Sequence, residues 1–137
     1  MKYFKILCLG LLTIAFFSGC EEQYKGEAME VGCYVEDYYS NSSYNYVRVY
    51  DDNSWTYRSS LAGETFEVGI CYSQTNSKPD YNNGSRKYRS IVYSGYISER
   101  FYFSEMHLTS GKKYYVRGYI KHKTGGIYYS DVRSFTP

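Results

Sequence analysis

The sequence is poor in the residues and motifs on which most enzymes depend. Its 137 residues include two histidines, His107 and His122, which do not form a metal-binding His-x-x-x-His pair. A Gly-x-Ser-x-Gly nucleophile elbow and a Gly-x-x-x-x-Gly-Lys phosphate loop are both missing. The acidic pair Asp51 and Asp52 is more typical of a turn than of a proton-sharing dyad. We therefore predict a protein that is not an enzyme and that uses no metal or cofactor.

The sequence also lacks an apolar run long enough to span a bilayer. Its longest run, residues 6–17, would extend about 18 Å as a helix, whereas the hydrocarbon core is about 30 Å thick. Lys2 and Lys5 precede this run, and small residues follow it. A basic start, a short apolar segment and small residues before a cut are typical of a secretory signal peptide. We predict that residues 1–19 are such a signal.

Residues 17–20, Phe-Ser-Gly-Cys, resemble the lipobox of bacterial lipoproteins. The resemblance implies that Cys20 becomes the first residue of the mature chain and carries the lipid, which anchors the protein to a membrane. Several acyl chains on one residue anchor firmly, because each buried methylene contributes about 0.8 kcal/mol. The alternative is ordinary cleavage with a free cysteine nearby.

Acidic residues follow the lipobox at once. Glu21 and Glu22 resemble the surface-export signals of some Bacteroidetes lipoproteins. The expected location is therefore the outer membrane, with lipid anchorage, and exposure at the cell surface is a further hypothesis.

Net charge is nearly absent as well. Lys2 and Lys5 account for the formal net charge of +2, so the chain without its signal is neutral. Phosphate binding needs an excess of positive charge, and we therefore expect no nucleic-acid partner. Acidic residues predominate over residues 20–52 and basic residues over residues 86–137. This asymmetry suits either a basic face for an anionic partner or paired strands of opposite charge.

Cysteines are few once the signal is removed and Cys20 carries lipid. Cys33 and Cys71 remain, in a compartment that permits disulfides. A bridge between them would close a loop of about forty residues and contribute about 3–4 kcal/mol to stability. Two buried thiols that act as small apolar side chains are the alternative, and the sequence leaves both open.

Helical periodicity is also missing from the chain after the signal. Short alternating segments rich in Tyr, Val, Ile, Thr and Phe are separated by Gly, Asn, Asp and Ser. Aromatic residues favour pleated surfaces, and all but one of the 20 tyrosines follow the signal. We predict an all-β chain of about seven strands, forming a single immunoglobulin-like or fibronectin type III-like two-sheet sandwich.

The chain divides into a tether at residues 20–28, an extra strand with a Tyr/Ser/Asn loop at 29–44, and a main domain at 45–137. The candidate strands lie at residues 28–39, 46–52, 54–61, 66–73, 88–97, 99–108, 112–122 and 126–135. The last two segments predict a terminal hairpin.

Several motifs of the main domain match one family. They are Leu108, Gly111 and Tyr114 before strand F, Val116, Arg117 and Tyr119 within it, Tyr129, Val132, Ser134 and Phe135 in the closing strand, and residues 67–73 in strand C. On these residues the domain resembles fibronectin type III-like modules of Bacteroidetes lipoproteins. The resemblance implies that Tyr114 is a tyrosine-corner residue whose hydroxyl bonds to the backbone a few residues upstream. Glu105 stands where the family has an apolar residue, so a bulge or register shift is expected there.

Tyrosines define two candidate binding sites for a protein or carbohydrate ligand. Tyr115, Arg117 and Tyr119 share one face of the expected strand at 112–122, opposite the face of Tyr114. Cross-strand tyrosine ladders that stabilise the sheet are the alternative for this face.

The second candidate site is the loop around residues 38–46. Tyr38, Tyr39, Tyr44 and Tyr46 lie there among Ser and Asn, a composition typical of adaptable binding loops. We therefore predict a binding or adhesion module. The alternative is an accessory subunit that docks onto another outer-membrane protein through a sheet edge.

Overall fold

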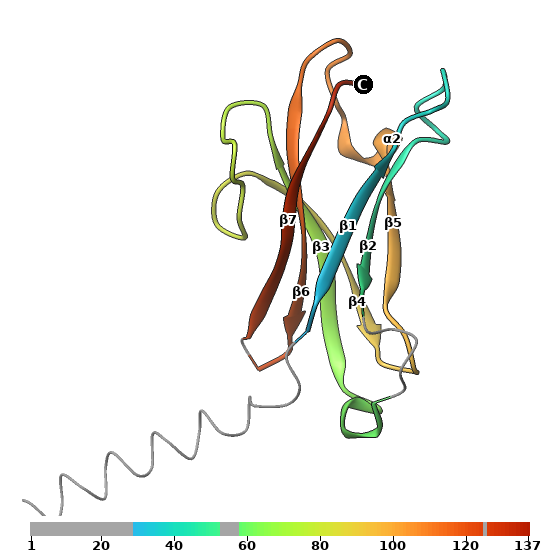
Figure 1. The fold of residues 1–137 in the computed structure, drawn as a ribbon, viewed down its shortest axis with the longest axis vertical. Coiled ribbons are helices and arrows are strands. Elements are labelled where there is room, and N and C mark those ends of the chain that lie inside the picture. Colours follow the sequence, from blue (N-terminus) through green and yellow to red (C-terminus); the bar gives the residue numbers. More distant parts are fainter. Residues whose placement is uncertain (1–28, 53–57, 125) are drawn as a thin grey trace, which may run out of the picture.

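The structure is a computed structural model that describes residues 29–52, 58–124 and 126–137. In these residues, seven β-strands form two antiparallel sheets that pack face to face (Figure 1). The three-stranded sheet has the order β1-β2-β5, and the four-stranded sheet has the order β4-β3-β6-β7. The predicted fold class, an all-β sandwich of the immunoglobulin and fibronectin type III kind, is confirmed.

The strands are β1 (Val31–Glu36), β2 (Tyr46–Asp51), β3 (Thr65–Ser73), β4 (Ser85–Val92), β5 (Ser98–Tyr102), β6 (Tyr114–His122) and β7 (Ile127–Phe135). A 3-10 turn spans Ser59–Leu61, and a short helix, α2, spans Phe103–Met106. Within the described ranges, no helix has the length and apolar character needed to cross a bilayer.

The core forms from the alternating residues of the facing strands. Phe66, Val68 and Ile70 of β3 point inward and are almost completely buried. They belong to the same apolar cluster as Val47 and Val49 of β2, which have no exposed surface. Each such side chain contributes about 1.5–3 kcal/mol on burial, so this two-residue alternation is what holds the sheets together.

Several of the candidate strands differ from the structure, and the one at 88–97 corresponds to β4 at Ser85–Val92. Of the segment at 54–61, residues 53–57 lie outside the described residues, and Ser59–Leu61 forms the 3-10 turn. The segment at 99–108 is a strand only as far as Tyr102 and continues as helix α2. Helix α2 begins there because the Glu105 carboxylate accepts a hydrogen bond of 2.8 Å from the Tyr102 backbone N–H.

The extra strand expected within residues 29–44 is an integral part of the sandwich. β1 pairs with β2 along its whole length, from the pair Val31 and Asp51 to the pair Glu36 and Tyr46. The following residues, 37–45, form the β1–β2 loop at one end of the molecule (Figure 1).

Two inward-pointing arginines close the open sides of the sandwich. Arg89 on edge strand β4 donates to the Arg100 carbonyl of β5 over 3.3 Å and to the Glu105 carboxylate over 2.8 Å. On the other side, Arg133 of edge strand β7 donates from Nε to the Cys33 carbonyl of β1 over 3.1 Å. Inward-pointing charges on edge strands oppose pairing with further strands, so both edges of the four-stranded sheet are protected.

Tyr114 ties the segment before β6 to the sheet. Its hydroxyl accepts a hydrogen bond of 2.8 Å from the backbone N–H of Thr109, five residues upstream, and one of 2.9 Å from Gln74 Nε2. Its ring stacks on Phe135 with centroids 5.6 Å apart. This is the hydrogen bond that the fibronectin type III resemblance implies for this tyrosine.

We predict that Tyr114→Phe lowers the free energy of unfolding by about 1 kcal/mol, because a part-buried backbone donor loses its acceptor. Urea denaturation measures the loss. Tyr115→Phe is the matched control, since among the described residues its hydroxyl has no hydrogen-bond partner, and it should change stability by less than about 0.5 kcal/mol. Equal effects of the two variants would contradict the role of Tyr114.

Candidate functional site

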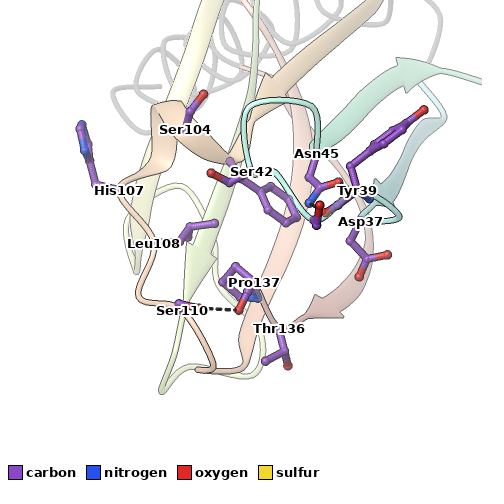
Figure 2. Close-up of a pocket in the computed structure, with 12 residues that line it drawn as sticks. Asp37, Tyr39, Ser42, Asn45, Ser104, His107, Leu108, Ser110, Thr136 and Pro137 are labelled. Atoms are coloured by element: carbon purple, nitrogen blue, oxygen red, sulfur yellow. Dashed lines mark hydrogen bonds between the residues drawn. The ribbon is translucent and has the colours of Figure 1, made fainter.

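A groove of about 560 Å³ lies at the end of the sandwich that carries the β1–β2 loop (Figure 2). The loop forms one wall, and the segment from α2 to residue 110 forms the other together with the last two residues. Residues that line it include Ser42, Asn45, Phe103, Leu108, Ser110 and Pro137. The walls are therefore distant in sequence and meet only in the folded chain.

The groove combines an aromatic floor with short polar groups. The Phe103 ring is 2% exposed and stacks on Phe135, with centroids 4.6 Å apart. Ser110 donates from its hydroxyl to the Pro137 carbonyl over 3.4 Å (Figure 2). Pockets that combine apolar surface with a few fixed polar groups are typical of ligand sites.

The β1–β2 loop has a hydrogen-bonded shape. The Asn45 side chain accepts from the Tyr39 N–H over 3.0 Å and donates to the Tyr39 carbonyl over 2.8 Å. The Asn45 carbonyl accepts from the Phe103 N–H over 2.9 Å, and the Asn41 carbonyl accepts from the Tyr44 N–H over 3.1 Å. The loop is thus tied both to itself and to α2, which reduces the entropy lost when it contacts a partner.

Three of the four predicted loop tyrosines project into solvent. Tyr38 is 83% exposed, Tyr39 54% and Tyr44 62%. The Tyr39 and Tyr44 rings lie 5.9 Å apart, tilted by 56°. Figure 2 shows the Tyr39 ring extending away from the centre of the groove, so this ring lies on the outer side of the wall that the loop forms. We call Tyr38, Tyr39 and Tyr44 the loop tyrosines.

Tyr46, the fourth predicted residue of this set, packs within the three-stranded sheet. It is 9% exposed, and its hydroxyl donates to the Glu36 carboxylate over 2.8 Å. Its ring contacts Tyr34 and Tyr102 at centroid distances of 6.2 and 5.7 Å. Hydrogen bonds with Tyr34 and Glu36 raise the pKa of Tyr46 above its ordinary value. These contacts are those of a cross-strand tyrosine ladder.

Tyr119, which lies on the predicted binding face of β6, packs into the protein and has a structural role. This residue has no exposed surface, and its hydroxyl donates to Glu67 over 2.7 Å. A Cβ atom at Gly69 would lie 2.6 Å from its ring, so the glycine provides the room that the ring occupies. Burial, followed by the bond to Glu67, raises the pKa of Tyr119. Tyr119 is therefore inaccessible to a ligand.

Its neighbours on β6 remain partly accessible. Tyr115 and Arg117 are both half-buried, and they point to the outer side of the four-stranded sheet. Lys113 lies 5.0 Å from the Tyr115 ring, and the Arg117 guanidinium lies 4.3 Å from the Tyr129 ring. We call this side of the sheet the outer cationic face. Its members are Arg86, Tyr88, Lys113, Tyr115, Arg117 and Lys121.

Both described cysteines are free and buried. Cys33 belongs to the core cluster, whereas Cys71 lies between the inward-pointing residues Ile70 and Tyr72 and so faces the opposite side of β3. The four-stranded sheet separates the two thiols. Of the two alternatives that the sequence left open, a disulfide or two buried thiols, the structure has the second. Burial raises the pKa of Cys33 to about 11 and that of Cys71 to about 12.

Among the described residues, no three His, Cys, Asp or Glu side chains come together as a metal site would require. Cys20, the predicted lipid-attachment residue, lies outside the described residues.

Comparisons with known proteins add no assignment. No protein-family model matches the chain, and neither the curated proteins nor the solved structures compared with it give a significant match.

The groove walls after α2 were not among the sequence-predicted site residues, and neither was Arg86. Phe103 and Ser110 lie in no motif, and Leu108 belongs to a motif of the fold rather than of binding, because their place in the groove depends on contact with a loop some sixty residues away. Arg86 could have been found only from the register of β4 on β3, which places it on the same side as Arg117.

The two raised thiol pKa values predict a loss of stability in alkali. A thiol whose pKa is higher in the folded state contributes its full stability below the unfolded value of 9.0, and this contribution falls as the pH rises toward 11 to 12. Urea midpoints of the wild type should therefore fall between about pH 9 and 10, before most tyrosines titrate. The variant Cys33→Ala/Cys71→Ala should show a flatter decline over this interval. Parallel declines would contradict burial of the thiols.

Proposed function

We propose that this chain is a non-enzymatic envelope lipoprotein that binds a protein or glycan through the loop tyrosines and the adjoining groove. The observation that carries the proposal is the exposure of Tyr38, Tyr39 and Tyr44 on a loop held by Asn45. A bound partner would cover rings that the free protein leaves in water. Burial of such rings is a large source of contact energy in protein interfaces.

Tyrosine is suited to this task because its ring offers a broad contact surface with only two side-chain torsions to restrict. The hydroxyl adds a hydrogen-bonding group that both proteins and sugars satisfy. Ser40, Ser42 and the Asp37 carboxylate lie on the same loop and border the groove. The site thus offers ring faces next to short polar groups, which suits either class of ligand.

The position of the loop agrees with lipid anchorage at the other end. β1 begins at the end of the sandwich opposite the β1–β2 loop (Figure 1). A lipid on Cys20 would join the domain through the residues that precede β1. The loop tyrosines would then point away from the membrane, where a partner can reach them.

A structural subunit that docks through a sheet edge is the second candidate function. The inward-pointing Arg89 and Arg133 weigh against it, because they protect the two edges of the four-stranded sheet. The exposed loop tyrosines have no role in edge docking, so we favour the binding module.

We predict that the variant Tyr38→Ala/Tyr39→Ala/Tyr44→Ala loses binding on glycan and protein arrays, while its melting temperature stays within about 2 °C of the wild type. Tyr96→Ala is the matched control, since Tyr96 is 64% exposed but lies between β4 and β5. It should retain binding. Loss of binding by this control would contradict the loop site.

Tyr46→Ala should give the opposite result in the melting-temperature measurement. Because the Tyr46 ring is buried in the sheet, its removal should destabilise the domain by about 3–5 kcal/mol. A large fall in melting temperature for the loop variant as well would show that the loop tyrosines pack rather than bind.

Lipid anchorage is tested separately by Cys20→Ser. We expect the wild type to partition into the detergent phase when detergent-solubilised envelopes are warmed, because acyl chains associate with micelles. The variant should partition into the aqueous phase while keeping the sheet signal in circular dichroism. A wild-type protein found in the aqueous phase would refute the anchor, and protease treatment of intact cells would establish which side of the membrane the domain faces.

A further inference from the structure

The outer cationic face has a charge pattern that the proposed loop site does not use. Arg86 of β4 and Arg117 of β6 both pair with Cys71 on the central strand β3. The two arginines therefore lie on one line across the sheet, with Cα atoms about 10 Å apart, which is twice the strand spacing. Lys121 lies farther along β6 on the same side, and Lys113 lies just before this strand.

Both arginines are held in place by the protein. The Arg86 guanidinium lies 3.9 Å from the Tyr81 ring centroid, and its Nη1 donates to the Tyr81 carbonyl over 3.3 Å. Arg117 lies 4.3 Å from the Tyr129 ring, and its Nε donates to the Ser130 carbonyl over 2.9 Å. Each guanidinium has five N–H donors, so donors remain on both after these bonds. Because stacking already restricts the side chains, an anion that binds them costs little further entropy.

Glu67 of β3 lies on this face, opposite Lys121, and Asp80 lies in the loop before β4, but neither forms an ion pair with the cations of the face. In the described part of the chain, the carboxylates within ion-pair distance of a basic side chain pair with Arg58, Arg89 or His122, none of which lies on this face. Glu67 accepts from the Tyr119 hydroxyl, and Asp80 accepts from the backbone of the turn at residues 82–83. Hydrogen bonds from Asn82 and Asn83 hold the pKa of Asp80 below its ordinary value.

We propose that the outer cationic face binds an acidic polysaccharide, with the carboxylate or sulfate groups of the polymer on Arg86 and Arg117. Planar guanidinium groups match both anions in charge and geometry. The lysines of the face add attraction along the polymer. Tyr88, which is 51% exposed, offers a ring to a sugar next to Arg86.

An anionic membrane surface fits the face less well. Interfacial membrane segments combine basic residues with large apolar side chains that enter the acyl region, whereas this face carries mainly arginine, lysine and tyrosine. This inference does not depend on the loop site, which lies at the end of the sandwich.

Binding to polygalacturonate and dextran sulfate tests the proposal, with neutral dextran as the negative control. The full-length protein in neutral detergent micelles should bind both charged polymers, and binding should weaken as salt screens the charges. The variant Arg86→Gln/Arg117→Gln should weaken binding by about tenfold or more, since charge-assisted hydrogen bonds are lost.

The matched control is Arg48→Gln/Arg100→Gln. These arginines lie over Tyr50 and Tyr46 on the three-stranded sheet, so the control removes the same charge from a similar environment on the other side. It should change affinity by less than about twofold. The loop-tyrosine variant should also retain polymer binding, which separates this proposal from the proposed function.

Several outcomes would overturn the proposal. They are failure of both charged polymers to bind, equal losses in the two double variants, and tighter binding to phosphatidylglycerol vesicles or duplex DNA than to the polymers. If Arg86→Gln/Arg117→Gln does not fold, amide chemical shifts of the wild type on titration with polygalacturonate replace it. Shifts concentrated on β4 and β6 support the face, and shifts elsewhere refute it.

Discussion

The packing of two sheets through alternating apolar residues is the constraint on which the rest of this protein depends. Along β3, every second side chain from Phe66 to Tyr72 enters the core, and the intervening residues must face outward. β6 obeys the same rule, with Val116 and Ile120 inward and Arg117 outward. The core therefore determines which residues are available at the surface, and a shift of one residue would exchange the two sets.

Many of the described tyrosines serve this architecture rather than a ligand. Tyr50 and Tyr119 cover glycines, since a Cβ atom at Gly32 or Gly69 would lie only 2.2 or 2.6 Å from their rings. Tyr46 fills the three-stranded sheet in the same way. Arginines stack on several tyrosine rings, as Arg48 does on Tyr50 of the three-stranded sheet and Arg117 on Tyr129 of the four-stranded sheet. The loop tyrosines differ because no sheet lies beneath them, and their rings stay largely in water.

Contact through these surfaces, rather than bond-making, is the common theme of the two proposals. The loop tyrosines offer rings on a hydrogen-bonded loop, and the outer cationic face offers arginines fixed on rings. In both cases the protein has restricted its side chains before a ligand arrives, which lowers the entropic cost of binding. The two surfaces lie on different parts of the sandwich and use different chemistry, and one molecule could therefore engage two ligands at once.

Local periodicity alone was enough to predict the all-β class, most strand positions and the inward face of β6, because alternation is a property of neighbouring residues. The turn of helix at Phe103–Met106 was not predictable in this way, since Glu105 is held by Arg89 of a strand distant in sequence. The same limit applied to the tyrosines. Composition marked both Tyr44 and Tyr46 as binding residues, yet one is exposed and the other buried. Only the pairing of β2 with β1 and β5 decided this, because burial depends on neighbours that the tertiary structure brings together.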